Sequence, residues 1–314
     1  MKDREASRYW LRRLGNSLIV IWGVSTLVFA TLRLVPGDPV ESILGETAQE
    51  VDKESLRQCL DLHHSIWTQY WIFLKEVAGG TFGELCDERG VTVMSKLIDA
   101  IPATIELAVA SLIVAAILAI PSGVWAALRR GKSADTFTAV VSLMGISIPN
   151  FWLGPMLLIL FSLTLAWLPD PGAGMEGVSG LILPAFTLGT ALAAKLSRMT
   201  RSSVLEVLEQ DYVRTARAKG LSEKIVIGKH VLRNSMIPVV TIMGLQFGAL
   251  LAGAIVVEKV FARPGLGTLL LEGIFNRNYR LVQGCVLVIA FANIFVNLLT
   301  DLVYTWIDPR VKLR

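Results

Sequence analysis

Six stretches of the chain are almost entirely apolar, and short segments with charged side chains separate them. Most of them approach about twenty residues, the length that an α-helix needs to cross a hydrocarbon core roughly 30 Å thick. The pattern predicts an all-α fold, a polytopic membrane helix bundle with about six transmembrane helices. The predicted spans are residues 14–35, 103–128, 137–165, 181–195, 236–257 and 282–306.

Composition supports a membrane protein. Hydrophobic residues make up 53% of the 314 residues and charged residues 18%, with a mean hydropathy of +0.57. A soluble domain has about 45–50% apolar and about 25% charged residues. The fourth span is the weakest of the six because it is short and contains Pro184. We retain it because the alternation of charge along the chain requires a crossing there.

The charged segments carry opposite signs in turn, except residues 258–281, which are predicted to be external but hold four basic and two acidic side chains. Residues 1–13 hold five basic and two acidic side chains, and residues 195–235 hold nine basic and four acidic ones. Residues 36–100 hold twelve acidic and five basic side chains. The positive-inside rule then predicts that both termini are cytoplasmic. Because the basic residues follow the membrane edges and form no single patch, the sequence pI near 9.0 does not indicate a nucleic-acid partner.

The spans divide the chain into predicted parts. Residues 1–13 mix arginine with aromatic residues, which predicts a cytoplasmic interfacial helix or a simple anchor for the first transmembrane helix, 14–35. Residues 36–100 predict an external segment with helices at 51–62 and 66–77, which shapes an entrance or packs around it. Residues 101–308 predict a core with the other five spans, followed by a cytoplasmic tail at 309–314.

The most informative segment is a predicted cytoplasmic hairpin at residues 210–233. A helix over 212–219 is followed by Gly220, which the pattern places in the left-handed conformation after the helix end. Ser222 is expected to cap a second helix that has Glu223 in its first turn. The predicted exposed face is Arg214, Arg217, Lys219 and Lys224, and the predicted apolar face is Val213, Ala216, Leu221 and Ile225.

This hairpin resembles the cytoplasmic "EAA" loop of bacterial ABC importer permeases, in the branch that handles dipeptides, oligopeptides and nickel. Gly220 takes the place of the motif glycine, and the sequences YVRTARAKGL and HVLRN are typical of the branch. The resemblance implies a coupling helix that docks on an ATPase; the alternative is a surface helix held by anionic membrane lipid. The implied coupling residues are Arg214, Thr215, Ala216, Arg217, Lys219, Gly220 and Leu221.

The resemblance extends over about residues 8–312, through blocks such as LRLVPGDP, SIPNFWLG and VEKVFARPGLG. It implies the type I ABC importer permease fold in a bacterial inner membrane. The implied partners are a second, homologous permease subunit in a heterodimer, two cytoplasmic ATPase subunits and an external solute-binding protein. ATP and magnesium belong to the ATPases, because Gly131-Lys132-Ser133 lacks the first glycine and the strand context of a phosphate-binding loop.

A few other residues are candidates for a path or a bond. Pro149 and Asn150 break the third span, and Glu106 and Asp301 are acidic residues inside spans, so these four are candidates to line the translocation path. Asp301 has an alternative, pairing with Lys195 or Arg198.

Cys59 and His63, four apart in a predicted helix, suggest a metal site, but we expect none because no second close pair is present. Cys59 and Cys86 share one external segment and leave a disulfide open.

The sequence therefore predicts a transport subunit with no enzymatic chemistry of its own. The resemblance favours dipeptides or oligopeptides as cargo, moved by alternating access, with a nickel or metal-chelate importer as the alternative. A secondary transporter driven by an ion gradient is a more distant alternative. It is disfavoured by the hairpin and by the lack of a buried chain of acids that relays protons.

The charge distribution generates a topology prediction. A reporter fused after Lys132 or after Arg314 should be cytoplasmic, and one fused near Glu50 should be external, because the basic segments stay inside. Reporter activity with the two faces exchanged would contradict the assignment.

Overall fold

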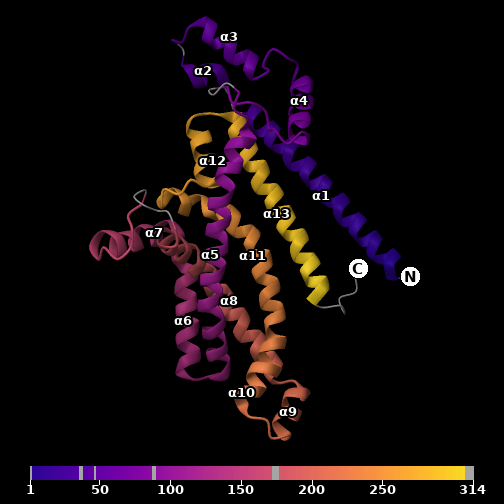
Figure 1. Cartoon of the computed structure of the whole chain (residues 1–314), viewed down its shortest axis with the longest axis vertical. Helices are drawn as coiled ribbons and strands as arrows, with labels where there is room; N and C mark the ends of the chain where they lie inside the picture. Colours follow the sequence, from indigo (N-terminus) through magenta and orange to yellow (C-terminus); the bar gives the residue numbers. More distant parts are fainter. Residues whose placement is uncertain (1, 35–37, 46, 87–89, 172–176, 308–314) are drawn as a thin grey trace. The chain divides into compact units, whose positions relative to one another are not determined.

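The computed structural model describes residues 2–34, 38–45, 47–86, 90–171 and 177–307. Within them the structure is helical, apart from one isolated β-bridge between Glu84 and Thr92 (Figure 1). Five helices are long and apolar enough to cross a membrane, and a sixth span is counted if two helices joined at a 97° bend act together. The predicted all-α bundle with about six spans is therefore confirmed.

The helices follow one another with short connections. In chain order they are α1 (Lys2–Arg33), α2 (Pro39–Leu44), α3 (Glu50–Cys59), α4 (Ile66–Ala78), α5 (Val93–Leu128), α6 (Ser133–Ser147), α7 (Asn150–Leu158), the π-helix η1 (Ile159–Thr164), α8 (Ser179–Leu208), α9 (Asp211–Ala218), α10 (Glu223–Ile225), the π-helix η2 (Val226–Leu232), α11 (Arg233–Val260), α12 (Leu266–Phe275) and α13 (Tyr279–Ile307). They fall into two compact units. Unit 1 comprises residues 1–104, 264–294 and 311–314, and unit 2 comprises 105–263 and 295–310.

The break predicted in the third span at Pro149 and Asn150 is present, because α6 ends at Ser147 and α7 leaves at a 97° bend. Two other predicted boundaries need correction. The fourth span is not short, since α8 has 30 residues and includes Pro184. The first helix is continuous across residue 13, so the chain shows no separate helix there, and the place of residues 1–13 on the membrane stays a prediction. The tail 309–314 lies outside the described residues.

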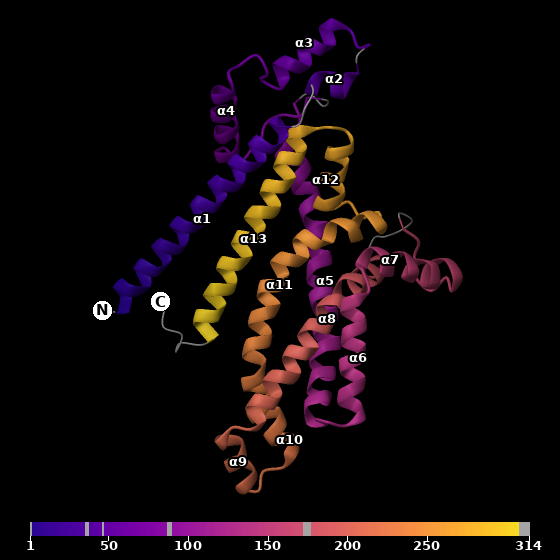
Figure 2. The ribbon, with the colours of Figure 1, turned by 180° about the vertical axis from the view of Figure 1, so that it is seen from behind.

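Helix α8 is the centre of unit 2. It contacts α6, α7 and α11, and both ribbon views show it running between these helices (Figures 1 and 2). Of the five long candidate spans it is the least apolar and the most buried. A helix surrounded by protein does not need an apolar surface for lipid, which explains why the sequence signal of this span is weak.

Glycines set the separation of α8 from its neighbours. A Cβ on Gly189 of α8 would lie 2.8 Å from the carbonyl oxygen of Ser111 in α5. A Cβ on Gly123 of α5 would lie 2.6 Å from the carbonyl oxygen of Ser197 in α8. Backbone stands against backbone at both points, the close approach that small residues permit between membrane helices. A hydrogen bond between Ser122 Oγ and Ser197 Oγ, 2.9 Å long, lies beside the second contact.

Unit 1 contains α1 packed on α4. The ring of Phe29 lies against those of Tyr70 and Phe73, at centroid distances of 5.1 and 5.4 Å. Thr26 Oγ1 and Tyr70 Oη are 2.7 Å apart, and Arg33 Nε donates to Gln69 Oε1 at 2.9 Å. These aromatic and polar contacts attach α4 to the end of α1.

Two cross-links organise the segment after α2. Cys59 and Cys86 form a disulfide, the bond that the sequence left open. Arg280 Nη2 donates to Asp61 Oδ2 at 2.8 Å, and its Nη1 lies 3.6 Å from Glu76 Oε1. Burial raises the pKa of Glu76, while the charge of Arg280 opposes this shift. The segment is thus linked to α13, whose sequence gives no sign of the pairing.

The helix–helix contact at Gly189 generates a stability prediction. Gly189→Ala places a methyl group against the backbone of α5, and overpacking of this kind costs about 1–3 kcal/mol. The melting temperature of the detergent-solubilised protein should therefore fall. Gly23→Ala in α1 is the matched control, since nothing lies within 4 Å of its Cβ, and it should be neutral or stabilising by about 0.5–1 kcal/mol. Equal melting temperatures for the two variants would refute the close contact.

Candidate functional site

The predicted hairpin is present and lies at one tip of unit 2. Helix α9 is followed by Gly220 at φ +79°, in the left-handed region that the sequence predicted. The N–H of Gly220 donates to the carbonyl of Arg217 at 2.9 Å, and the N–H of Leu221 donates to that of Ala216 at 3.4 Å. This pair of bonds is a Schellman motif, which satisfies the last carbonyls of α9 and reverses the chain.

The second half of the hairpin differs from the prediction. Ser222 occupies the N-cap position of α10, but its side chain makes no capping hydrogen bond. The helix continues as the π-helix η2 and merges with α11, so the chain re-enters the membrane segment without a break. A π-helical stretch inside longer helices is uncommon and is frequently found at functional sites.

A small apolar cluster fixes the hairpin on α8. Val213 and Ala216 of α9 are buried against Val204 of α8 and Val226 of η2. Leu221 and Ile225, predicted on the same apolar face, are exposed instead. Ala216, which the resemblance implied as a coupling residue, has only 5% of its surface exposed, because the cluster within this chain covers it.

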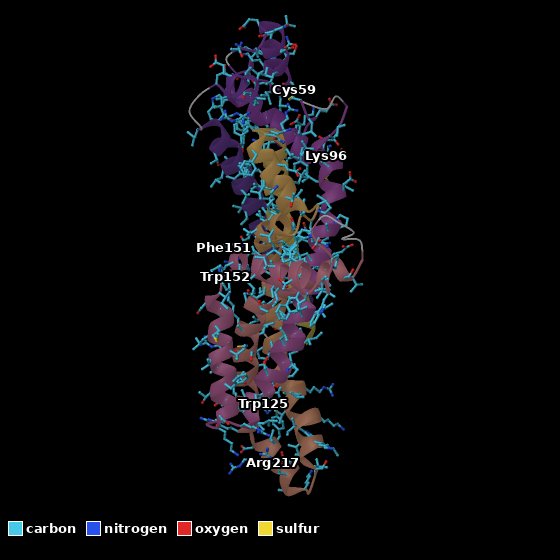
Figure 3. The ribbon with its side chains drawn as sticks, turned by 90° about the vertical axis from the view of Figure 1, so that its left-hand side faces the viewer. Cys59, Lys96, Trp125, Phe151, Trp152 and Arg217 are labelled. Atoms are coloured by element: carbon cyan, nitrogen blue, oxygen red, sulfur yellow. A yellow bond between two sulfur atoms is a disulfide. The ribbon has the colours of Figure 1, made fainter. Side chains whose placement is uncertain are left out.

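The outer face of the hairpin is basic, as predicted. Arg214, Arg217, Lys219 and Lys224 are all exposed, and Figure 3 shows Arg217 near the tip of unit 2. Arg217 Nε donates to Glu223 Oε1 at 2.8 Å, an ion pair that spans the turn at Gly220. The coupling roles expected of Arg214, Thr215, Arg217, Lys219, Gly220 and Leu221 stay predictions.

Tyr212 links the two arms of the hairpin. Its hydroxyl accepts a hydrogen bond of 2.8 Å from Asn234 Nδ2 in α11. Ser203 Oγ of α8 donates to the carbonyl of Ser235 at 2.8 Å, which joins the same turn of α11 to α8. The hairpin is therefore held by α8 and α11 together, and its surface has a fixed geometry.

The predicted path residues whose side chains the structure describes lie on different elements. Pro149 precedes α7 at the sharp bend, and Asn150 is the first residue of that helix. The neighbouring Phe151 and Trp152 are exposed and lie at the end of α6 away from the hairpin (Figure 3). Glu106 accepts from Arg263 Nη2 at 3.2 Å, and this arginine is almost fully buried. The side chain of Asp301 lies outside the described part of the structure.

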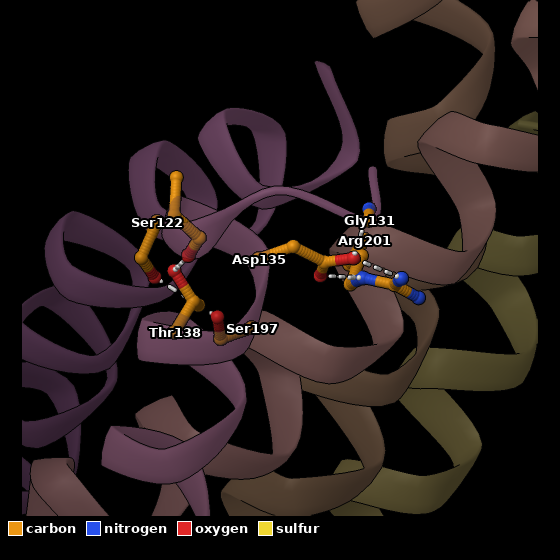
Figure 4. A network of polar contacts seen from close by, with 7 residues as sticks. Ser122, Gly131, Asp135, Thr138, Ser197 and Arg201 are labelled. Carbon is orange, nitrogen blue, oxygen red and sulfur yellow. Dashed lines mark hydrogen bonds and ion pairs between the residues drawn. The ribbon is translucent and has the colours of Figure 1, made fainter. Parts of the chain in front are cut away.

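An ion pair that the sequence did not reveal joins α6 to α8. Arg201 Nε donates to Asp135 Oδ1 at 2.5 Å and Arg201 Nη2 donates to Oδ2 at 2.8 Å (Figure 4). The N–H of Gly131 adds a third hydrogen bond to Oδ2 at 3.0 Å. The sequence offered one signal for this pair. Arg201 continues the helix of the fourth span, and an arginine near the membrane is expected to have a polar partner.

A pocket of about 920 Å³ lies beside this ion pair, within unit 2. Two of its lining side chains, Lys195 and Arg198, are exposed cations on α8. The sequence placed them only as possible partners of Asp301. The other lining residues come from α6, α8 and α11: Asp135, Thr136, Thr138, Ala139, Ser142, Leu143, Ile146, Ser197, Met199, Arg201, Ser202 and Ile242.

The geometry of the segment between α1 and α5 does not match the metal site considered in the sequence analysis. Helix α3 ends at Cys59, so His63 does not follow it on one helix face. Cys59 is bonded to Cys86, and the rings of His63 and His64 lie against each other at a centroid distance of 4.6 Å. Among the described residues, no group of three His, Cys, Asp or Glu side chains has the spacing of a metal site.

Two family models match the chain. Residues 119–313 match the model described as "Binding-protein-dependent transport system inner membrane component". Residues 6–108 match the model for the N-terminal part of such membrane components. The two matches leave only a short stretch between them, so the similarity covers both the external segment and the hairpin.

Curated relatives are similar over their whole length. The chain is 40% identical to the di/tripeptide transport system permease protein DppB of Pseudomonas aeruginosa, over 96% of this chain and 97% of the relative. It is 40% identical to the glutathione transport system permease protein GsiC of Escherichia coli (strain K12), over 98% of this chain and 99% of the relative.

Solved structures share the fold at low identity. The methionine ABC transporter MetNI, in an inward-facing form, aligns with a TM-score of 0.54 at 14% identity, over 68% of this chain and 97% of that chain. An amino acid ABC transporter crystallised with histidines aligns with a TM-score of 0.50 at 14% identity, over 76% and 98%.

Proposed function

Because this chain belongs to the family of binding-protein-dependent transport system inner membrane components, we propose that it is the membrane-spanning subunit of an ATP-driven importer of short peptides. The proposal rests on sequence identity with two named permeases. The chain is 40% identical, over nearly its full length, to permeases named for di/tripeptides and for glutathione, itself a modified tripeptide. The chain is a transport subunit, and its cargo moves by alternating access.

Nickel is the less favoured cargo. The relatives described above are named for peptides. Cys59, the strongest candidate metal ligand in the sequence, forms a disulfide. A thiolate is the ligand form of cysteine, so a disulfide sulfur does not serve that role.

The hairpin of α9, α10 and η2 is the proposed coupling element. Its inner face is buried in the cluster with Val204, while Arg214, Arg217 and Lys219 lie exposed on its outer face. A hairpin whose backbone is already held in place suits docking in an ATPase groove. It loses little conformational entropy on binding, and that loss would otherwise reduce the affinity. Ala216 contributes by fixing the position of α9 and does not itself touch the partner.

The remaining assembly follows the same proposal. Two ATPase subunits bind ATP and magnesium on the hairpin side, and a second, homologous permease subunit completes the membrane part as a heterodimer. An external solute-binding protein delivers the peptide. The protein lies in a bacterial inner membrane with both termini cytoplasmic, the orientation that the basic segments 1–13 and 195–235 support.

The cargo is tested with the complete complex in lipid vesicles. Trialanine uptake should require ATP and the binding protein, and the same vesicles should take up no Ni²⁺. His63→Ala with His64→Ala should leave peptide uptake unchanged, since both histidines are exposed and the disulfide remains intact. ATP-driven Ni²⁺ uptake that disappears in this double variant would establish the metal alternative.

The coupling role is tested at Gly220. In Gly220→Val a β-branched residue enters the left-handed region, where a side chain costs about 1–2 kcal/mol, and α9 shifts relative to α10. No atom lies within 4 Å of the added Cβ, so the effect comes from the backbone alone. Peptide-stimulated ATP hydrolysis should fall about tenfold or more, the equivalent of ~1.4 kcal/mol, while membrane insertion is retained.

Gly131→Val is the matched control. Gly131 has φ +74° and equally open surroundings, but it lies in the turn between α5 and α6. Its variant should retain co-purification with the ATPase and normal ATP hydrolysis. If the Gly220 variant also behaves like wild type, the hairpin is not the coupling element, and a lipid-bound surface helix explains it better.

A further inference from the structure

The pocket in unit 2 has a volume suited to a small molecule. Its 920 Å³ falls within the range of about 300–1,000 Å³ that is typical of ligand sites in proteins. Its walls come from α6, α8 and α11, and none of the proposed coupling residues lines it. Exposed apolar side chains of α6, such as Leu143 and Ile146, line it together with the cations of α8.

The pocket carries an excess of positive charge. Three cations and one carboxylate line it, and the carboxylate of Asp135 is engaged by both nitrogens of the Arg201 fork and by the N–H of Gly131. A bidentate pair of this kind is electrically neutral and geometrically fixed. Among the described residues, Lys195 and Arg198 form no ion pair, so their two charges remain available.

These cations lie near the middle of α8, at the end of its apolar part. Helix α8 has 30 residues and is about 45 Å long at 1.5 Å per residue, which exceeds a hydrocarbon core of roughly 30 Å. Lys195 is the last residue of the predicted span 181–195, and about 20 Å of helix follow it before the end at Leu208. The pocket therefore lies at the predicted cytoplasmic edge of this span, where basic side chains are common.

The spacing directs both charges to one place. Lys195 and Arg198 are three residues apart on α8, so they are neighbours on one helix face, and Ser202 continues this face one turn further. Guanidinium and ammonium groups donate several hydrogen bonds and accept none, which suits a carboxylate or a phosphate. The same charges would repel a divalent metal cation.

We infer that Lys195 and Arg198 bind the α-carboxylate of the peptide in transit, at a site midway along α8. The inference rests on the proposed function and adds a specificity-determining pair to it. Short peptides differ in their side chains but share a terminal carboxylate, so a site for that group serves the whole class. Asp135 and Arg201 hold α6 and α8 at the distance that keeps the pocket open.

The first test is transport by the complete complex in vesicles. Lys195→Gln with Arg198→Gln should lower trialanine uptake at subsaturating concentration by at least about tenfold, the loss of one charge-assisted hydrogen bond or more. Lys195→Arg with Arg198→Lys keeps both charges and should retain uptake, which separates a charge requirement from a folding defect. Lys132→Gln, an exposed cation outside the pocket, should behave like wild type.

The outcomes separate the two levels of the proposal. If the wild-type complex takes up no trialanine, the proposed function fails. If wild type transports and the double glutamine variant transports equally well, the function stands and the carboxylate site is refuted. Loss of uptake in the charge-conserving variant as well would also refute it, because the side chains would then act by shape and packing.

The second test identifies the source of the anion. Arg198→Cys introduces a thiol, while Cys59 and Cys86 are bonded and Cys285 is buried. In the complete complex, an anionic methanethiosulfonate should react faster than a cationic one, because Lys195 attracts it. Trialanine should slow the reaction, and trialanine amide, which lacks the terminal charge, should not.

Three results would overturn the assignment. If the rate responds to the phosphatidylglycerol content of the vesicles and not to trialanine, the pocket binds a lipid phosphate. If the thiol reacts in the isolated chain but not in the complex, the second permease subunit covers the pocket. Equal slowing by trialanine and its amide would likewise show that the carboxylate is not recognised.

Discussion

The backbone contact between α5 and α8 is the constraint on which unit 2 depends. At Gly123 and Gly189 the two helices approach so closely that a single Cβ on either would strike a carbonyl oxygen of the other. Lipid offers no hydrophobic drive for helices to associate, so dispersion contacts at short range and interhelical hydrogen bonds must hold them together. The Ser122–Ser197 bond and the Asp135–Arg201 fork extend this attachment toward the hairpin.

Helix α8 contains Pro184, but from Lys195 to its end at Leu208 it has no proline, so we expect this part to move as one element. Its middle presents Lys195 and Arg198 to the pocket, and its last turns hold Val204 against the hairpin cluster. A displacement of the hairpin therefore moves the pocket wall by a comparable amount, without a flexible joint between them. The hairpin also continues directly into α11 through the π-helix η2. There, η2 and Pro238 interrupt the regular backbone hydrogen bonding and permit bending. The two routes from the hairpin thus differ in stiffness.

Local signals in the sequence predicted what local physics controls. Gly220 was recognised because a chain reversal between two helices favours a residue without a Cβ, and the six apolar segments were recognised because lipid selects for them. The end of α8 was missed because its buried face mixes polar residues such as Ser197 and Thr200 with the apolar ones. Leu221 and Ile225 were assigned to the wrong surface, since such short helices do not reveal which neighbour covers which face. The Asp135–Arg201 and Asp61–Arg280 pairs join residues 66 and 219 positions apart, and no local pattern encodes such pairings.

The link between Arg280 and Asp61 has a consequence for biosynthesis. Asp61 and Glu76 leave the ribosome some two hundred residues before the arginine that neutralises them. During that interval the disulfide can already close the 27-residue interval between Cys59 and Cys86, but the carboxylates remain solvated and the segment lacks its last attachment. Insertion of α13 is therefore the event that completes the N-terminal part of the molecule. A chain arrested before this helix carries an accessible, incompletely folded segment between α1 and α5, which offers proteases a way to remove unfinished subunits before they assemble.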